Sequence, residues 1–431
     1  MTTLKRQPVI FTTPILSHPP IGGPALRIEN SILALAGVCD LHVHCRAEEA
    51  ELGGPKAADF FTGRVAGFSF AGGRRGFFSR RGPGQRSTLL ERACGIARRL
   101  DPRRRPSGEA AEIVALARRL GARIVWFGYG NISYEVMREV QRLAPDLRLV
   151  CDTDSVWSRF VLRELDLERD PSRRRAIEAE GSRKQQEEKA WVAMCDVTTA
   201  VSEVDAEYYR SLLPRTDKVR LFRNVINLDT YASPPPPAAG LRRPAIFLAG
   251  SFWPNSPMEH AARWFVTEVF PGVLRTVPQA VLHVAGKDSD RILADLGRDN
   301  VRILGRVDSV LPYLCHADVA IVPLFFESGT RFKILEAGSC GIPVVSTTLG
   351  AEGIDVVDGT HLLLADDPSS FASAVLRVLR EPGLGSKLGS RLHELVARDY
   401  SLPALAAEGR EILALLSRTA RTTAPTTPMT Q

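Results

Sequence analysis

Short apolar runs alternate with longer amphipathic stretches along the second half of the chain. The apolar runs have the length of buried strands, and they occur at 245–249, 280–284, 301–304 and 319–322. The last run leads into a stretch with helical spacing of its apolar residues, which Gly329 and Thr330 open and Gly341 closes. The next apolar run begins at Pro343. This order predicts parallel β-α-β units in the second half.

The first half shows the same alternation. Strands are predicted at 8–11, 123–127 and 147–150. A proline and glycine turn that contains Gly22 and Gly23 follows the first strand, and a helix is predicted over 26–36. The chain is therefore expected to be an α/β protein with two Rossmann-like, doubly wound domains that face a cleft.

Four consecutive prolines separate these halves, and they favour an extended polyproline segment and exclude a helix. From this we expect an N-terminal domain, a proline-rich linker, a C-terminal domain, a helix that could cross back onto the first domain, and a disordered tail rich in Thr and Pro. The corresponding ranges are 1–231, 232–244, 245–400, 401–417 and 418–431.

Composition and charge limit the classes of partner. With 44% hydrophobic and 24% charged residues among 431, the chain reads as an ordinary globular protein of two domains. The net charge of +7, from 56 Lys and Arg against 49 Asp and Glu, is too small to indicate a nucleic-acid partner. Seven cysteines without paired spacing favour a reducing compartment. Because no signal peptide or long apolar run is seen, we expect a cytoplasmic protein without a membrane span.

One short segment concentrates possible metal ligands. Strand alternation over 39–45 would place His42 and His44 on one face, so that a metal site is geometrically possible. No second cluster of such ligands occurs elsewhere in the sequence. We therefore expect no metal and interpret the segment as a strand that reaches toward the cleft.

The turn before Glu336 is the strongest candidate for a binding site. Backbone N–H groups at the start of a helix lack internal partners and lie at the positive end of its dipole, so a diphosphate is a natural ligand beside Gly329 and Thr330. Arg331 and Lys333 would add positive charge there, although they could also form a solvated helix start. Glu336 lies roughly 10 Å further along the helix. At that distance its carboxylate could accept the hydroxyl protons of a ribose.

The segment 327–353, ESGTRFKILEAGSCGIPVVSTTLGAEG, resembles the donor-site signature of the GT-B glycosyltransferases. It is most similar to the retaining family 4 (group 1), in which a KxLEA helix precedes a GxPVV strand and a glycine-rich loop. The resemblance covers residues 8–45 and 190–400 and is most specific in the second domain. It implies a GT-B fold that binds an acceptor in the first domain and a nucleotide-sugar donor in the second, without a cofactor or a metal ion.

Members of this family hold the donor with two glutamates that have seven residues between them. The second glutamate binds the ribose and corresponds here to Glu336, whereas the first contacts the sugar and falls on Ser328. The nearest carboxylate is Glu327, one residue earlier. Either the loop brings Glu327 to the sugar, or Glu352 beside Gly350 serves it. A solvated loop acid is the plain alternative for Glu327.

The same resemblance implies further donor contacts. After the strand at 245–249 the chain reads Gly250-Ser251-FWPNSPMEHAARWF, similar to the family's GSMxWxPNxDAxxWF variant. Many relatives carry an Arg and a Lys there that hold the diphosphate; this chain lacks both, and Arg331 and Lys333 could replace them. The remaining expected donor contacts are Gly286, Val307, Gly22 and Gly23. The last two could approach the donor across the cleft because they lack side chains, or could form a plain chain reversal.

The stretch 60–106 is rich in Phe, Arg and Gly. It could touch anionic lipid headgroups at the inner membrane face or bind a polyprenyl-phosphate acceptor. The plainer interpretation, which we prefer, is a pair of strands with apolar faces and basic edges. Base stacking with nucleic acid is a third and weaker alternative.

Taken with the resemblance, these features predict a transferase. It would move a sugar from a nucleoside diphosphate sugar to an unknown glycan, lipid-linked or small-molecule acceptor, with retention at the anomeric carbon. Glu327, Arg331 and Lys333 are the expected catalytic residues. Arg331 and Lys333 would stabilise the negative charge that develops on the leaving diphosphate, and Glu327 would contact the sugar. The alternatives are a nucleotide-sugar epimerase of the same fold and a non-catalytic scaffold or partner subunit. The displaced Glu327 and the missing basic pair would suit the latter.

Overall fold

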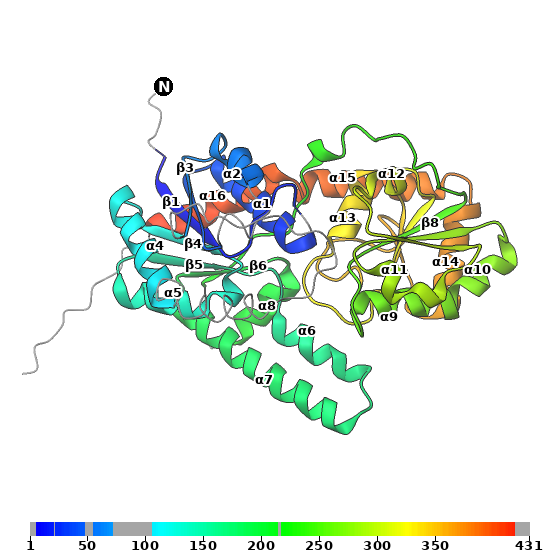
Figure 1. Ribbon diagram of the computed structural model, residues 1–431, viewed down its shortest axis with the longest axis horizontal. Coiled ribbons are helices and arrows are strands. Elements are labelled where there is room, and N and C mark those ends of the chain that lie inside the picture. The colour runs from blue at the N-terminus through cyan, green and yellow to red at the C-terminus, as the bar shows by residue number, and fades with distance from the viewer. Residues whose placement is uncertain (1–5, 21, 48–54, 72–105, 214–216, 419–431) are drawn as a thin grey trace, which may run out of the picture.

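Two parallel β-sheets lie side by side in the protein (Figure 1). The computed structural model describes residues 6–20, 22–47, 55–71, 106–213 and 217–418. Each sheet carries helices on its faces, and together they form the two expected Rossmann-like domains.

The first domain contains a sheet that has seven strands within the described residues, in the order β3-β2-β1-β4-β5-β6-β7. Every adjacent pair runs parallel. The strands are β1 (Pro8–Thr13), β2 (Asp40–Cys45), β3 (Gly67–Phe70), β4 (Ile124–Gly128), β5 (Arg148–Asp152), β6 (Val197–Ala200) and β7 (Val219–Leu221). The helices are α1 (Gly22–Ala36), α2 (Pro55–Thr62), α4 (Pro106–Leu120), α5 (Tyr134–Leu143), α6 (Trp157–Arg163), α7 (Pro171–Met194) and α8 (Glu203–Ser211), with short 3₁₀ turns at Gly130–Ile132, Glu164–Asp166 and Leu228–Thr230.

The second domain contains a six-stranded parallel sheet in the described part of the chain, in the order β10-β9-β8-β11-β12-β13. Its strands are β8 (Ala245–Ala249), β9 (Val281–Ala285), β10 (Val301–Gly305), β11 (Val319–Val322), β12 (Val344–Ser346) and β13 (Leu363–Leu364). Its helices are α9 (Pro257–Trp264), which continues through a π-helical turn (Phe265–Val269) into α10 (Phe270–Thr276), then α11 (Ser289–Ile292), a 3₁₀ turn (Ala294–Leu296), α12 (Leu311–Leu314), α13 (Phe332–Ser339), α14 (Pro368–Arg380) and α15 (Leu384–Asp399).

Burial explains why the strands are visible in the sequence. Helices cover both faces of a parallel sheet, so its inner strands are apolar at every position rather than at alternate ones. All residues of β4 and β11 are buried, and both strands read as continuous apolar runs. The sequence prediction of an α/β fold with two Rossmann-like domains is confirmed.

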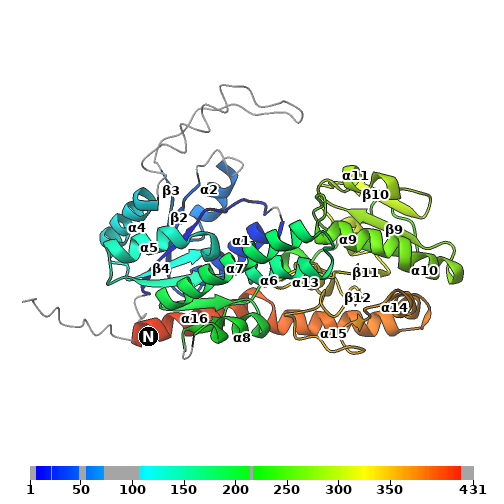
Figure 2. The ribbon, with the colours of Figure 1, turned by 90° about the horizontal axis from the view of Figure 1, so that it is seen from below.

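The last helix returns to the first domain. Helix α16 (Leu402–Arg418) follows α15 along one side of the molecule and packs against α1 (Figure 2). Its apolar residues Leu405, Ile412, Leu413 and Leu416 belong to the hydrophobic core of the first domain. A Cβ atom at Gly409 would lie 2.8 Å from the Leu35 side chain, so the small size of glycine suits the close approach of the two helices.

The segment 232–244 contains neither helix nor strand and is tied to the second domain. The backbone N–H of Ala238 donates to the carbonyl of Pro312 at 3.0 Å. The ring Nε2 of His316 lies 2.7 Å from the carbonyl of Pro235. The extended linker therefore runs against α12.

Two helices begin elsewhere than the sequence predicted. Helix α1 begins at Gly22 rather than at residue 26, so Gly22 and Gly23 form its first turn, followed by Pro24. Proline suits this place because the first helical N–H groups have no internal partner. Helix α13 begins at Phe332, because Gly329 has a φ of +81° and Arg331 is extended. The N–H groups of Gly329 and Thr330 therefore precede the helix instead of opening it.

The Phe- and Arg-rich stretch is described only in part. Phe60 and Phe61 lie on helix α2, which the sequence did not predict, whereas Phe68 and Phe70 lie on strand β3. Residues 72–105 lie outside the described part of the chain, as does the tail 419–431. Among the described helices, none combines the length and apolar character needed to cross a bilayer.

Candidate functional site

The loop before α13 lies against the first domain. A Cβ atom at Gly329 would lie 2.7 Å from the Asp154 carbonyl, so only glycine permits this approach. The backbone N–H of Val156 donates to Ser328 Oγ at 3.2 Å. Thr330 Oγ1 donates to the Val201 carbonyl at 3.3 Å. These contacts hold the start of α13 between the two sheets.

The turn at Gly23 approaches the same place from the first domain. A Cβ atom on Gly23 would lie 3.3 Å from the ring of Phe332, the first residue of α13. Leu26, one turn further along α1, packs against the hydrophobic core of the second domain. The structure therefore brings Gly23 together with the start of α13.

Arg331 is the N-cap residue of α13, and its side chain is buried, with 4% of the residue exposed. Nη2 donates to the Leu349 carbonyl at 3.2 Å. Nε and Nη1 have no hydrogen-bond partner among the described residues. Burial lowers the pKa of Arg331, and the nearby acids Glu327, Glu352 and Asp205 oppose this shift. A buried guanidinium with two unused donor atoms is costly unless an acceptor reaches it.

Lys333 and Glu327 lie close to Arg331. Burial lowers the pKa of Lys333, with Glu327 as the strongest opposing charge. Its Nζ lies 3.2 Å from the Sδ atom of Met258 on α9. The backbone carbonyl of Glu327 accepts a hydrogen bond from Arg163 Nη1. The carboxylate of Glu327 is therefore part of the charged cluster rather than a remote loop acid.

Glu336 lies on α13 one turn beyond Lys333 and is part-buried. Its Oε1 accepts a hydrogen bond from the hydroxyl of Tyr231 at 3.2 Å. Burial raises the pKa of Glu336, whereas the Tyr231 hydrogen bond and the charge of Lys333 lower it. The carboxylate thus has one fixed partner and a cation nearby.

Glu352 connects the two domains. Its Oε2 lies 2.7 Å from Arg163 Nη2 and 3.3 Å from Arg159 Nη2, both on α6. Burial acts to raise the pKa of Glu352, but Arg163 and Arg159 together lower it overall. Asp205, at the start of α8, completes the cluster. Burial raises its pKa to about 6, although Arg159 partly offsets this.

The remaining expected donor residues lie at the carboxyl ends of the strands of the second sheet. Gly286 has a φ of +143°, and a Cβ atom there would lie 1.6 Å from the Gly250 carbonyl. A Cβ atom at Gly350 would lie 2.4 Å from the Val322 carbonyl. Close packing of backbone therefore accounts for these glycines. Ser251 is exposed, and Val307 packs against the core of its domain.

The acid that ends β5 has a structural partner. Asp152 is fully buried and accepts hydrogen bonds from Arg27 and from Thr199 Oγ1. Arg27 also donates to Asn224 Oδ1 at 2.7 Å. These bonds join α1, β5, β6 and the segment after β7 within the first domain.

Three charged residues and one tyrosine of this region were not predicted as site residues. Arg159 and Arg163 are four residues apart on α6, a spacing that places them on one helix face and could have marked them. Asp205 stands in the motif AMCDVTTAVSEVD without a local sign of its burial. Tyr231 stands just before the proline-rich linker, and no sequence signal connects it with Glu336.

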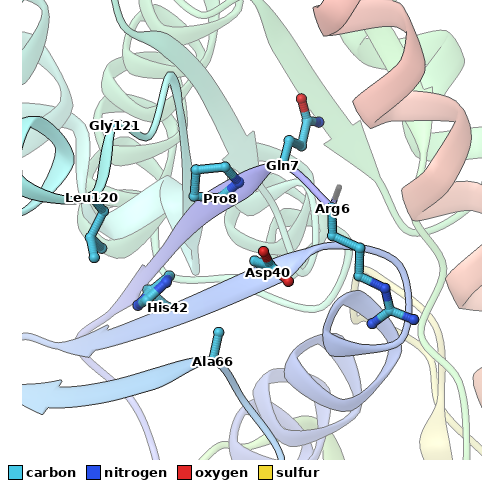
Figure 3. A pocket seen from close by; sticks show the side chains of 8 residues that line it. All are labelled: Arg6, Gln7, Pro8, Asp40, His42, Ala66, Leu120 and Gly121. Carbon is cyan, nitrogen blue, oxygen red and sulfur yellow. The ribbon is translucent and has the colours of Figure 1, made fainter. Parts of the chain in front are cut away.

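A separate hollow of about 600 Å³ lies at the amino ends of β1 and β2, away from α13 (Figure 3). Asp40 and His42 line it, together with Arg6 and Leu120. His44, on the same strand, is buried and lies 3.1 Å from Ser69 Oγ. No group of three or more His, Cys, Asp or Glu side chains suited to a metal ion occurs in the part of the chain that the structure describes.

Comparisons with known proteins agree with this architecture. Residues 243–381 match the family model described as Glycosyl transferases group 1. Glycogen synthase of Mycobacterium tuberculosis is 26% identical over 171 residues, which are 37% of this chain and 41% of the relative. The lipopolysaccharide core biosynthesis glycosyltransferase LpsE of Rhizobium meliloti is 29% identical over 146 residues, or 32% and 43% of the two chains. The match thus spans about two fifths of each curated relative.

Solved structures match nearly the whole chain. HepE of Anabaena, solved with UDP and glucose, superimposes with a TM-score of 0.60 at 12% identity, covering 95% of this chain and 99% of HepE. Sucrose-phosphate synthase of Thermosynechococcus elongatus gives a TM-score of 0.64 at 18% identity, covering 96% and 99%. The chain therefore has the GT-B fold, and its residues 243–381 match the model of the group 1 glycosyltransferases.

Proposed function

We propose that this protein is a glycosyltransferase that moves a sugar from a nucleoside diphosphate sugar to an acceptor hydroxyl, with retention at the anomeric carbon and without a metal ion. The acceptor is a glycan, a lipid-linked sugar or a small molecule. The names of the group 1 relatives and the complex of HepE with UDP and glucose support the class of reaction and of donor.

The observation that carries the proposal is the unsatisfied guanidinium of Arg331. A buried cation normally has paired donors, because each unmet donor costs free energy. Nε and Nη1 of Arg331 lack such partners among the described residues, and Arg331 is the N-cap residue of α13, a helix whose first N–H groups have no partner within the helix. A diphosphate supplies the oxygen atoms and the negative charge that this place lacks.

The neighbouring residues suit the other parts of the donor. Lys333 pairs with the negative charge of the diphosphate, Glu336 accepts hydrogen bonds from the ribose hydroxyls, and Glu327 contacts the sugar. Negative charge grows on the leaving diphosphate in the transition state, so Arg331 and Lys333 bind that state more strongly than the ground state. These roles are part of the proposal.

Entry of the donor requires the domains to move apart. Arg331 is buried, and the loops around Ser328 and Glu352 are bonded to the first domain. An opening that breaks these few contacts would expose Arg331 without unfolding either sheet. Domain closure over a ligand is a common motion in two-domain enzymes.

Thermal unfolding with UDP, GDP, ADP and dTDP tests the proposal, because a ligand that binds only the folded state raises the melting temperature. We expect one nucleotide to stabilise the wild type. Glu336→Ala should weaken its binding by about 1–3 kcal/mol. Glu268→Ala, an exposed acid of the same domain, is the matched control and should behave as the wild type.

Failure of every nucleotide to bind would contradict the donor site and favour a non-catalytic relative. If a nucleotide binds, the products formed from the corresponding nucleotide sugar, with and without an acceptor, distinguish a transferase from an epimerase. Isomerisation without any acceptor would identify an epimerase and overturn transfer. A product with the same anomeric configuration as the donor sugar would show that the reaction proceeds with retention.

A further inference from the structure

The hydroxyl of Tyr231 connects the end of the first half of the chain to the donor-domain helix. Tyr231 follows the short turn at 228–230, yet its side chain packs in the hydrophobic core of the second domain and is 9% exposed. Its hydroxyl lies 3.2 Å from Oε1 of Glu336, a residue 105 positions later.

The direction of the hydrogen bond is fixed by electrostatics. Burial raises the pKa of Tyr231 far above its usual value, and the carboxylate of Glu336 raises it further. The phenol therefore keeps its proton at neutral pH and donates a hydrogen bond to Oε1. The lone pairs of Oε2 remain for another donor.

We infer that Tyr231 is a positioning residue for the donor site, holding Glu336 by Oε1 so that Oε2 faces a ribose hydroxyl of the bound nucleoside diphosphate. This inference rests on the proposed function. Tyr231 itself does not touch the reacting atoms. Its contribution is to fix one rotamer of a carboxylate that would otherwise swing toward Lys333.

The same hydrogen bond favours the ionised form of Glu336, which accepts hydrogen bonds from ribose hydroxyls. Burial raises the pKa of Glu336, and two groups oppose this: Tyr231 by its hydrogen bond and Lys333 by its charge. The thiols of Cys340 at the end of α13 and Cys315 at the end of α12 also lie near the phenol. On the packed helix α15, the ring of His393 faces the Gly338 carbonyl instead.

Substitution by phenylalanine removes only the hydroxyl. With the ribonucleoside diphosphate that binds the wild type, UDP being tried first, Tyr231→Phe should weaken affinity about tenfold, the effect of losing a hydrogen bond to a charged group. The wild type should also bind the 2′,3′-dideoxy analogue more weakly than the ribonucleotide, and Tyr231→Phe should reduce this preference. Tyr313→Phe, on α12 with its ring against Phe247, is the matched control and should change neither value.

The pH profile distinguishes positioning from a merely structural effect. Only the ionised carboxylate leaves Oε2 free to accept a hydrogen bond from the ribose. The affinity for the nucleotide should therefore fall as the pH drops through the pKa of Glu336. Loss of the Tyr231 hydroxyl raises that pKa, and the fall in affinity should therefore begin at a higher pH in Tyr231→Phe. Glu336→Gln does not ionise, and its profile reports the other groups that titrate, which are the nucleotide phosphate and acids near Arg331 such as Asp205.

A double-mutant cycle completes the test. If the two side chains act as one unit, Tyr231→Phe should have little further effect on affinity in the Glu336→Gln background. Wild-type affinity, ribose preference and pH profile in a folded Tyr231→Phe protein would overturn the inference while leaving the donor site intact. An equal loss of affinity on Tyr231→Phe substitution in the wild type and in Glu336→Gln would also overturn the inference. Absence of nucleotide binding to the wild type would instead contradict the proposed function.

Discussion

Arg163 of the first domain donates from Nη2 to Oε2 of Glu352 in the second, with 2.7 Å between the two atoms. Arg159 reaches the same oxygen at 3.3 Å. The carboxylate thus joins two cations of α6 to the loop that follows β12, close to Arg331. A movement of the domains that admits a donor would have to break this ion pair.

Glu352→Gln should weaken this contact between the domains. A part-buried ion pair contributes about 1 kcal/mol or slightly more, so a comparable loss of unfolding free energy is expected at pH 7. The pKa of Glu352 lies below its ordinary value of 4.5 in the folded protein. Its contribution is therefore present above pH 4.5 and is lost as the pH falls through the folded pKa. The difference from the wild type, measured by denaturant unfolding, should shrink below that pH.

An exposed ion pair provides the comparison. Glu203 and Arg210 form a pair within α8 in which both side chains are about half exposed. Glu203→Gln should change stability by only a few tenths of a kcal/mol. If Glu352→Gln were as harmless as Glu203→Gln, the Arg163–Glu352 pair would not hold the domains together.

Asp205→Asn should stabilise the protein at neutral pH. Burial raises the pKa of Asp205 from 3.8 to about 6, and one oxygen of the carboxylate has no hydrogen-bond partner among the described residues. The folded state thus binds a proton that the unfolded state has lost, and stability falls as the pH rises from about 4 to 6. Asparagine avoids this cost, which is about 1–3 kcal/mol.

Urea unfolding of Asp205→Asn and the wild type between pH 4 and pH 8 measures the effect. The free energy of unfolding of the variant, relative to that of the wild type, should rise with pH up to about pH 6. Above that pH the difference should stay constant. A loss of stability at pH 7 would show that the ion pair of Asp205 with Arg159 outweighs burial.

Local sequence patterns revealed the sheets but not the contacts between them. Strands β8 and β11 begin and end where their apolar runs do, because buried parallel strands must be apolar throughout. Helix α2 was missed because Phe60 and Phe61 also suit a strand. The pairs Arg163–Glu352 and Tyr231–Glu336 join residues 189 and 105 positions apart. Periodicity reports only on neighbours within an element, so no such pair could be predicted from it.

The start of α13 shows the same limit on a smaller scale. Gly329 and Thr330 carry the composition of a helix start, yet the chain becomes helical only at Phe332. Gly329 is left-handed and lies so close to the other domain that a Cβ atom on it would be 2.7 Å from the Asp154 carbonyl. A tertiary contact thus overrides the local signal. The roles of Glu327, Arg331, Lys333 and Glu336 toward a donor remain predictions.

Arg331→Gln should weaken the binding of nucleoside diphosphates more than the binding of nucleosides. Its unused Nε and Nη1 are available to an anion, and hydrogen bonds from a guanidinium to phosphate contribute about 1.5–3 kcal/mol. Isothermal titration with the diphosphate and the corresponding nucleoside separates the two effects. Arg377→Gln, which removes an exposed arginine paired with Glu381, is the control. Equal weakening of nucleoside and diphosphate would remove Arg331 from the phosphate site.

Gly23→Val should disturb the donor helix from the opposite domain. Even a methyl group at Gly23 would lie 3.3 Å from the ring of Phe332, so the two branches of valine push against the first residue of α13. Overpacking of this kind costs about 1–3 kcal/mol. Because Phe332 follows Arg331 directly, the displacement should reach the anion site and lower nucleotide affinity.

The control for this variant is Gly63→Val, since a Cβ atom there meets nothing within 4 Å. Both proteins should fold, as judged by circular dichroism, and only Gly23→Val should lose nucleotide affinity by titration. Gly23→Ala should fall between them, because a shift of a few tenths of an ångström relieves its single close contact. Wild-type affinity in Gly23→Val would mean that the first turn of α1 moves away from α13 when the donor binds.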